Sequence, residues 1–178
     1  MEKAIFLDKD GTITEYNTKR SDSTPEEILK DVLMEEKVLD GLKYLQEKGF
    51  KLIVISNQSW IGRGVVTAEQ IEDLFKELVL KLDEKGVKID DYFYCPHRKA
   101  DGCGCRKPGH QLLIDAAKKH GVNLENSYMV GDSVYDIGAG KNAGTRTILV
   151  RTGKNTDFSD DFGADYFVDD INALRKII

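Results

Sequence analysis

Short apolar runs alternate along this chain with longer stretches in which apolar residues recur at helical spacing. The short runs predict buried strands over residues 4–7, 51–56, 92–94, 128–130, 147–150 and 166–168. The longer stretches predict helices over residues of about 35–48, 67–85, 109–120, 135–143 and 171–178. A glycine, which is typical of helix C-termini, follows each of the first four. This alternation favours an α/β fold with a mainly parallel sheet flanked by helices.

No internal repeat, low-complexity tract or linker divides the chain. Its 178 residues suit one domain that can bury a proper core, so we expect a single domain over residues 1–178. Parallel sheets of this kind bind ligands beyond the carboxyl ends of their strands. Asp8, Ser56 and Asp132 all stand at such ends, so the candidate site is expected there.

Composition excludes some classes of function. Hydrophobic residues make up 40% of the chain and charged residues 32%, as in an ordinary soluble protein. A formal charge of -5 argues against nucleic-acid binding through a basic surface. No apolar stretch approaches the roughly 18 residues of a membrane span, and the acidic, weakly apolar N-terminus does not resemble a signal peptide. We therefore expect a cytoplasmic protein without a membrane partner and, by default, a monomer.

Two carboxylates follow the first predicted strand, Asp8 and Asp10, and Gly11 comes directly after them. A buried strand needs no charge at its end, so this pair requires an explanation. One acid can attack phosphorus as a nucleophile while the other transfers a proton. The alternative is a strand followed by an Asp-Gly turn, as at a hairpin.

Other polar groups follow the next strands. Ser56 and Asn57 can offer a hydroxyl and backbone N–H groups to a phosphoryl oxygen, or can form an ordinary polar loop. Lys107 precedes a predicted helix, where its ammonium can offset charge on a transferring phosphoryl group. The alternative is that Arg106 and Lys107 are simply a solvated basic pair.

Asp132 and Asp136 lie one helical turn apart after the fourth predicted strand, so both can face one site. Carboxylate oxygens are suitable ligands for Mg²⁺. The alternative is that Asp132 or Ser133 caps the following helix while Asp136 faces solvent.

The three cysteines of the chain fall within eleven residues and are joined by one histidine. Cys95, His97, Cys103 and Cys105 form a set that suits tetrahedral Zn²⁺ and leaves no open position, so the zinc would be structural. The metal would stiffen the segment that carries Arg106. The alternative is three free cysteines and a surface histidine.

Four segments together, in this order, resemble the haloacid dehalogenase superfamily of phosphohydrolases. They are residues 8–12 (DKDGT), Ser56, Lys107, and residues 131–132 with Asp136. The resemblance implies a Rossmann-like domain with its active site at the strand tips.

It also implies residue roles. Asp8 would be the nucleophile that forms an aspartyl-phosphate. Asp10 would protonate the leaving oxygen and then activate water. Mg²⁺ would be held by Asp8, the backbone carbonyl of Asp10, and Asp132. Ser56, Asn57 and Lys107 would bind the phosphoryl group, with Thr12 and Asp136 in support. An aspartate two residues after the nucleophile is typical of the phosphatases of this superfamily.

The cysteine segment and the Arg-Lys-Pro that follows it resemble the branch that contains heptose bisphosphate phosphatases and histidinol phosphatases, which lack a large cap domain. Residues 56–64, with Arg63, are more similar to the heptose enzymes. The resemblance thus implies removal of one phosphate from D-glycero-D-manno-heptose 1,7-bisphosphate. By motif order, Arg63 and Arg106 are the best-placed positive charges, and we expect them to bind the second phosphate. Trp60 and Ser133 depart from the usual pattern.

Three alternatives remain. The substrate can instead be histidinol phosphate or another small phosphorylated metabolite. A phosphatase acting on nucleic-acid ends is disfavoured by the acidic net charge and the lack of a binding module. A zinc-stabilised interaction protein with a lapsed active site is disfavoured by the complete set of candidate catalytic residues.

Overall fold

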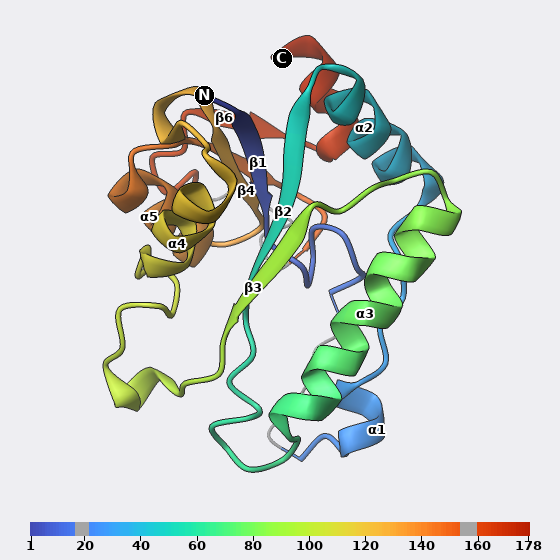
Figure 1. The fold of residues 1–178 in the computed structure, drawn as a ribbon, viewed down its shortest axis with the longest axis vertical. Helices are drawn as coiled ribbons and strands as arrows, with labels where there is room; N and C mark the ends of the chain where they lie inside the picture. The colour runs from blue at the N-terminus through green and yellow to red at the C-terminus, as the bar shows by residue number, and fades with distance from the viewer. Residues whose placement is uncertain (17–21, 154–159) are drawn as a thin grey trace.

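The computed structural model describes residues 1–16, 22–153 and 160–178. It contains a six-stranded sheet in the order β3-β2-β1-β4-β5-β6, and every neighbouring pair of strands is parallel (Figure 1). The strands are β1 (Lys3–Leu7), β2 (Phe50–Asn57), β3 (Asp91–Cys95), β4 (Tyr128–Gly131), β5 (Arg146–Val150) and β6 (Tyr166–Val168). All six predicted strands are confirmed. The hairpin alternative for Asp8 is excluded, because β1 lies inside the sheet between parallel neighbours.

Helices cover both faces of the sheet. They are α1 (Pro25–Ile28), α2 (Glu36–Glu47), α3 (Ala68–Glu84), α4 (Gln111–His120) and α5 (Val134–Ala143), with the 3₁₀ segments η1 (Lys99–Asp101), η2 (Leu124–Asn126) and η3 (Ile171–Lys176). Four differ from the prediction. The 3₁₀ segments η1 and η2 were missed, and so was the short α1, although Thr24 and Glu27 form a capping box at its start. The last predicted helix is a 3₁₀ helix over Ile171–Lys176; side chains three residues apart align in such a helix, and Ile171 and Leu174 are both buried.

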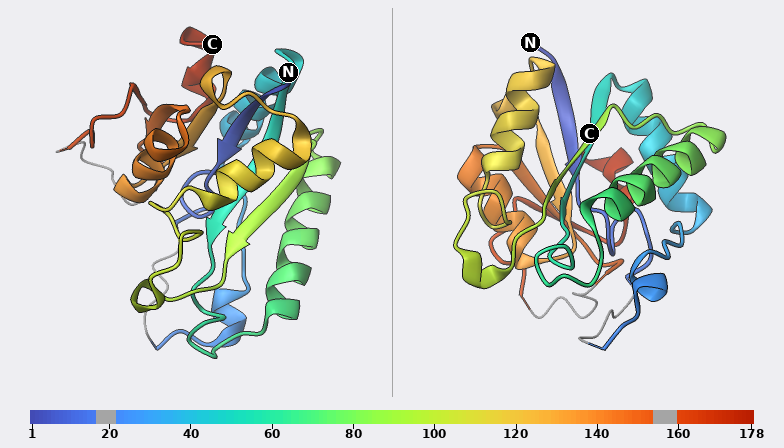
Figure 2. Two further views of the ribbon diagram at one scale, coloured as in Figure 1. Left: turned by 60° about the vertical axis from the view of Figure 1, so that its left-hand side comes forward. Right: turned by 60° about the horizontal axis from the view of Figure 1, so that its bottom comes forward.

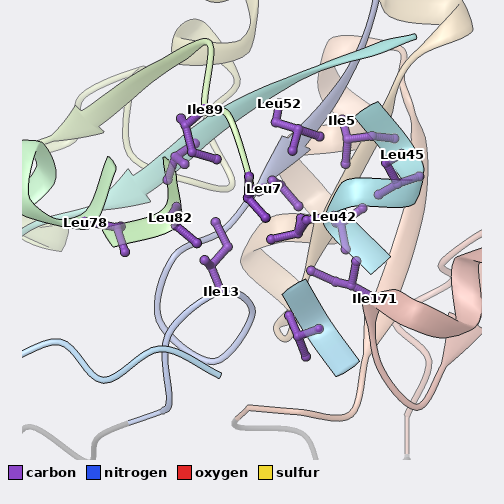
Figure 3. Close-up of a cluster of buried hydrophobic side chains, with 14 of the residues drawn as sticks. Ile5, Leu7, Ile13, Leu42, Leu45, Leu52, Leu78, Leu82, Ile89 and Ile171 are labelled. Atoms are coloured by element: carbon purple, nitrogen blue, oxygen red, sulfur yellow. The ribbon is translucent and has the colours of Figure 1, made fainter. Parts of the chain in front are cut away.

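The alternating side chains of the central strands divide the core in two. Ile5, Leu7, Leu52 and Val54 face α2, α3 and η3 in the larger cluster. Figure 3 shows part of it, with side chains such as Leu42 of α2 and Leu82 of α3 directed toward the sheet. The intervening strand residues, among them Ala4, Phe6, Ile53 and Ile55, contact α4 and α5 on the other face. Two views from other sides show the same three layers (Figure 2).

The order of the strands changes direction between β1 and β4. From β1 the chain moves outward to β2 and β3, then returns to β4 and moves out the other way. Ligand sites of open α/β sheets lie beyond the strand ends at such a switch point. Asp8 follows β1 and Asp132 follows β4, so both stand at this position.

In the described part of the chain, no helix is both long and apolar enough to span a membrane.

Candidate active site and cysteine cluster

Lys107 joins two carboxylates at the switch point. Its ammonium nitrogen, Nζ, lies 2.5 Å from Oδ1 of Asp8 and 2.6 Å from Oδ1 of Asp136, and donates a 2.7 Å hydrogen bond to the carbonyl oxygen of Ile55. The Lys107 side chain is only 3% exposed. The alternative of a solvated basic pair is therefore wrong for Lys107: the ammonium is held inside the site by groups just after β1, on β2 and on α5.

Three carboxylates converge around this ammonium. One oxygen from each of Asp8, Asp132 and Asp136 lies within 4.8 Å of the other two, an arrangement that can hold a metal ion. The backbone approaches closely here, because a Cβ on Gly11 or Gly153 would overlap the Asp132 carboxylate. Gly11 also has a φ of +90°, which favours glycine. These glycines let two loops close around Asp132.

Asp136 both caps α5 and faces the site. Its Oδ2 accepts hydrogen bonds from the backbone N–H and the hydroxyl of Ser133, at 3.1 and 2.6 Å, while its other oxygen contacts Lys107. Asp136 is 1% exposed, so the alternative in which it faces solvent is wrong. Ser133, noted above as a departure from the family pattern, takes part in the cap that orients Asp136.

Burial and charge oppose each other in the site. Burial raises the pKa of Asp8 well above its ordinary value; Lys107 lowers it in part, while Asp136 and Asp132 raise it further. Burial alone would lower the pKa of Lys107, but the charges of Asp136 and Asp8 raise it above the usual range, so the ammonium stays charged. One lysine does not offset three buried carboxylates, and an added cation would favour the ionised form of Asp8.

The second strand supplies neutral polar groups. Asn57 and Lys107 are linked twice: Nδ2 of Asn57 donates to the Lys107 carbonyl at 3.2 Å, and the Lys107 N–H donates to Oδ1 of Asn57 at 3.0 Å. Ser56 is 1% exposed and its hydroxyl accepts a 2.8 Å hydrogen bond from Nε2 of Gln58. Thr12, predicted to support the site, is fully buried.

An open cleft of about 240 Å³ lies above these groups. It is lined by Asp8, Asp10, Tyr16, Ser56, Asn57, Arg106, Lys107, Asp132, Ser133, Tyr135 and Asp136. The cleft thus brings together nearly all the predicted phosphate-binding and catalytic residues. Arg63 is not among the lining residues; it is exposed, and its guanidinium carbon lies 4.8 Å from the centre of the Trp60 ring.

Lys9 and Gln58 are contacts of Asp10 that sequence reasoning missed. Lys9 Nζ donates to Oδ1 of Asp10 at 2.8 Å and to both oxygens of Asp31, at 2.7 and 2.9 Å. Gln58 Nε2 lies 3.5 Å from Oδ2 of Asp10. The position of Lys9 between two candidate catalytic acids could have indicated a contact with Asp10. Its other partner, Asp31, lies 22 residues away, so nothing in the sequence indicated that the two would meet.

The four metal-ligand candidates of the cysteine segment meet at one point. Nδ1 of His97 and the Sγ atoms of Cys95, Cys103 and Cys105 all lie within 4.8 Å of one another. The Sγ of Cys105 is 3.1 Å from that of Cys95 and 3.4 Å from that of Cys103. Burial and the hydrogen bond with Cys105 raise the pKa of the Cys95 thiol to about 12, so Cys95 loses its proton only when a cation binds there. The set can hold one tetrahedral metal ion.

The cysteine cluster is connected to the cleft. Arg106 Nη1 donates a 3.2 Å hydrogen bond to the carbonyl oxygen of His97, and Arg106 itself follows Cys105 and lines the cleft. Cys95 is fully buried at the end of β3, so the cluster is fixed to the sheet at one side. One hydrogen bond and the chain itself therefore connect the cluster to Arg106, the residue that precedes Lys107.

Known proteins with similar sequences are named as hydrolases and phosphatases. Residues 104–174 match the family model described as "HAD-hyrolase-like". The D-glycero-beta-D-manno-heptose-1,7-bisphosphate 7-phosphatase of Haemophilus influenzae is 34% identical, over 100% of this chain and 97% of the relative. The enzyme of the same name from Haemophilus ducreyi is 38% identical, over 86% of this chain and 85% of the relative.

Solved structures agree with these relatives. The crystal structure of D,D-heptose 1,7-bisphosphate phosphatase from B. bronchiseptica, complexed with magnesium and phosphate, has a TM-score of 0.85 and 27% identity, and the match covers 98% of this chain and 97% of that one. The corresponding enzyme from Burkholderia thailandensis, at 22% identity and a TM-score of 0.72 over 99% and 97%, shows the same fold. The chain therefore belongs to the haloacid dehalogenase family of hydrolases and, with these named relatives, is a phosphatase.

Proposed function

We propose that this phosphatase is Mg²⁺-dependent, works through an aspartyl-phosphate on Asp8, and removes one phosphate from D-glycero-D-manno-heptose 1,7-bisphosphate. The observation that carries the chemistry is the ion-paired group of Asp8, Lys107 and Asp136 beside Asp132. The names of the relatives at 34–38% identity support the sugar bisphosphate and point to its 7-phosphate.

In the proposed reaction, an oxygen of Asp8 attacks the phosphorus while the bond to the leaving oxygen breaks. Asp10 gives its proton to that oxygen as it leaves. Asp10 then takes a proton from water as the water oxygen attacks the phosphorus, the Asp8–phosphorus bond breaks, and phosphate departs. Lys107, Ser56 and Asn57 hold the phosphoryl oxygens and offset their charge.

The residues present fit a Mg²⁺ site. Asp8 and Asp132 would hold the ion with the backbone carbonyl of Asp10, and Asp136 would support the site. Carboxylate and carbonyl oxygens are the ligands that Mg²⁺ prefers, and three clustered carboxylates require a compensating charge. Bound there, Mg²⁺ supplies Lewis-acid stabilisation of charge on the phosphoryl oxygens. Zn²⁺ would have a structural role at Cys95, His97, Cys103 and Cys105.

Substrate choice can be tested directly. Phosphate release should be measured with Mg²⁺ on heptose 1,7-bisphosphate, its monophosphates, histidinol phosphate and nucleotides. We expect the highest kcat/KM for the bisphosphate, because a second phosphate can bind a guanidinium through two parallel hydrogen bonds. A higher kcat/KM for histidinol phosphate would replace the heptose assignment with the alternative one.

Arg106 and Arg63 should differ in their effect on this preference. Arg106 lines the cleft, whereas Arg63 contacts Trp60 outside the lining residues. We expect Arg106→Ala to lower kcat/KM for the bisphosphate by about 10- to 100-fold, as for the loss of one charge-assisted contact of roughly 1.5–3 kcal/mol. Arg63→Ala should cost less. Phenyl phosphate, which lacks a second phosphate, serves as the control substrate for both variants.

If Arg106→Ala lowers kcat/KM for phenyl phosphate as much as for the bisphosphate, Arg106 does not bind the second phosphate. If only Arg63→Ala lowers the preference, the selectivity role belongs to Arg63, as the sequence resemblance implied.

The close approach of Gly153 to Asp132 gives a test of the Mg²⁺ site. A Cβ at Gly153 would overlap the Asp132 carboxylate, so we expect Gly153→Ala to displace one of the proposed ligands. We expect the Mg²⁺ concentration for half-maximal activity to rise by about 10- to 100-fold. Gly104→Ala, whose Cβ would meet no atom within 4 Å, is the control. An unchanged Mg²⁺ requirement in Gly153→Ala would remove Asp132 from the ligand set.

A further inference from the structure

Lys9 is a charged residue with no access to solvent. Its side chain is 0% exposed, although a buried ammonium loses its hydration and is rarely tolerated without partners. It lies between the proposed nucleophile and the proposed acid in sequence but is not among the residues that line the cleft. The reaction described above assigns it no part, so its burial needs another explanation.

Two carboxylates hold the Lys9 ammonium from different parts of the chain. Asp31, which is 7% exposed and follows α1, accepts through both oxygens at 2.7 and 2.9 Å. Asp10 accepts through Oδ1 at 2.8 Å and remains 31% exposed toward the cleft. Lys9 is therefore tied to a buried acid at one side and directs a proton-transfer group at the other.

The backbone around Lys9 is equally well fixed. Its carbonyl oxygen accepts hydrogen bonds from the N–H groups of Ile13 and Thr14, both at 3.0 Å, and from the Thr14 hydroxyl at 3.2 Å. The ammonium is held from two sides, because it donates to three oxygens of two carboxylates that come from different parts of the chain. A donor fixed in this way can hold a carboxylate in one rotamer.

We propose that Lys9, clamped by Asp31, is a positioning residue that helps to hold the Asp10 carboxyl group in the orientation needed to protonate the leaving oxygen. The proposal rests on the proposed role of Asp10 as general acid. Lys9 itself does not touch substrate. Without the clamp, Asp10 would spend more time in rotamers that cannot reach the leaving oxygen, and proton transfer would slow.

The dependence on the leaving group distinguishes this role from a merely structural one. 4-Nitrophenolate is a weak base and departs without a proton, whereas phenolate is a stronger base and gains much more from an acid. The two aryl phosphates are otherwise alike in shape. The quantity to measure is kcat/KM, which reports the steps up to departure of the leaving group and is not affected by later hydrolysis of the aspartyl-phosphate.

For Lys9→Met we expect kcat/KM to fall about 10- to 100-fold with phenyl phosphate, part of the 10²–10⁴-fold effect of general acid catalysis. With 4-nitrophenyl phosphate it should fall less than about threefold, since that step needs no acid. Lys9→Arg, which can still hold two carboxylates, should restore most of the phenyl phosphate activity. Asp31→Asn, which keeps the lysine but weakens its clamp, should show the same selective loss to a smaller degree.

Lys51→Met is the matched control, because Lys51 pairs with Asp90 at the opposite end of the sheet, 3.9 Å away. It should leave the ratio of the two kcat/KM values unchanged. Because Lys9→Met removes the buried ammonium that both oxygens of Asp31 contact, the double variant Lys9→Met/Asp31→Asn should be measured beside it. Asp31→Asn alone keeps the test decisive if neither accumulates as folded protein.

Asp10→Asn separates this proposal from the proposed function. Equal slowing of both substrates in Lys9→Met and Asp31→Asn, with a selective loss in Asp10→Asn, overturns the positioning role and leaves Asp10 as the acid. If Asp10→Asn itself slows both substrates equally, its general-acid role fails and the positioning role fails with it. A selective loss in all three variants, with rescue by Lys9→Arg, supports both.

Discussion

Replacing Asp8 with asparagine is expected to abolish turnover while leaving the fold intact. The amide keeps the size of the side chain but cannot attack phosphorus, so we expect kcat to fall by at least about 10⁴-fold, as when other catalytic nucleophiles are removed. The structure gives a reason for the fold to survive: Asp8 is one of three clustered carboxylates, and its loss relieves repulsion from Asp132 and Asp136.

The measurement is phosphate release from a good aryl phosphate at saturating Mg²⁺, together with the melting temperature. Asp73→Asn, on the exposed face of α3, is the matched control and should be fully active. Rapid quenching of the wild-type enzyme with radiolabelled substrate should trap phosphate on the protein, whereas the Asp8→Asn variant should carry none. Near-normal activity of folded Asp8→Asn protein would contradict the assignment of Asp8 as the nucleophile.

Loss of one ligand from the cysteine cluster should have the largest effect on stability. We predict one tightly bound zinc per chain, and Cys105→Ser should abolish it, since the Cys105 sulfur lies near both other sulfurs and His97 Nδ1. The free energy of unfolding should fall by roughly 3–4 kcal/mol, the stabilisation given by a ligand present at about 10²–10³ times its Kd. Activity should fall too, because Arg106 is bonded to the His97 carbonyl.

Elemental analysis of protein purified without added zinc, and denaturant unfolding with and without chelator, measure these effects. His97→Ser and His110→Ser form a matched pair of exposed histidines, of which only His97 faces the sulfurs. Only the first should lose zinc and stability. Wild-type protein without metal, with all three thiols freely titratable in the native state, would contradict the zinc site.

Much of the molecule follows from local patterns. The apolar runs located all six strands, because a strand buried in a parallel sheet needs consecutive apolar residues whatever its neighbours are. The helix ends were marked by caps and glycines, which act within a few residues. Asp8 and Asp132 were found because strand ends are visible in the sequence and the carboxyl ends of parallel strands share one edge. The cysteine cluster was found because its members lie close together in the chain.

Other features depend on residues that are far apart in sequence, and only the tertiary structure decided them. The sheet order places Lys107 on Asp8, 99 residues away, and buries it, although the local sequence also suited a solvated basic pair. The 3₁₀ geometry of η3 reflects packing on α2, since a segment of that length has little helical preference of its own. Arg106 lines the cleft and Arg63 does not, although the order of the motifs made both arginines equally good candidates for binding a second phosphate.

Lys9 would be expected at the surface from its residue type alone. It is buried beside Asp31, a carboxylate that the fold brings to it from 22 residues away. Local patterns report the free energy of short segments, whereas the burial and pairing of charges depend on which distant groups the folded chain brings into contact.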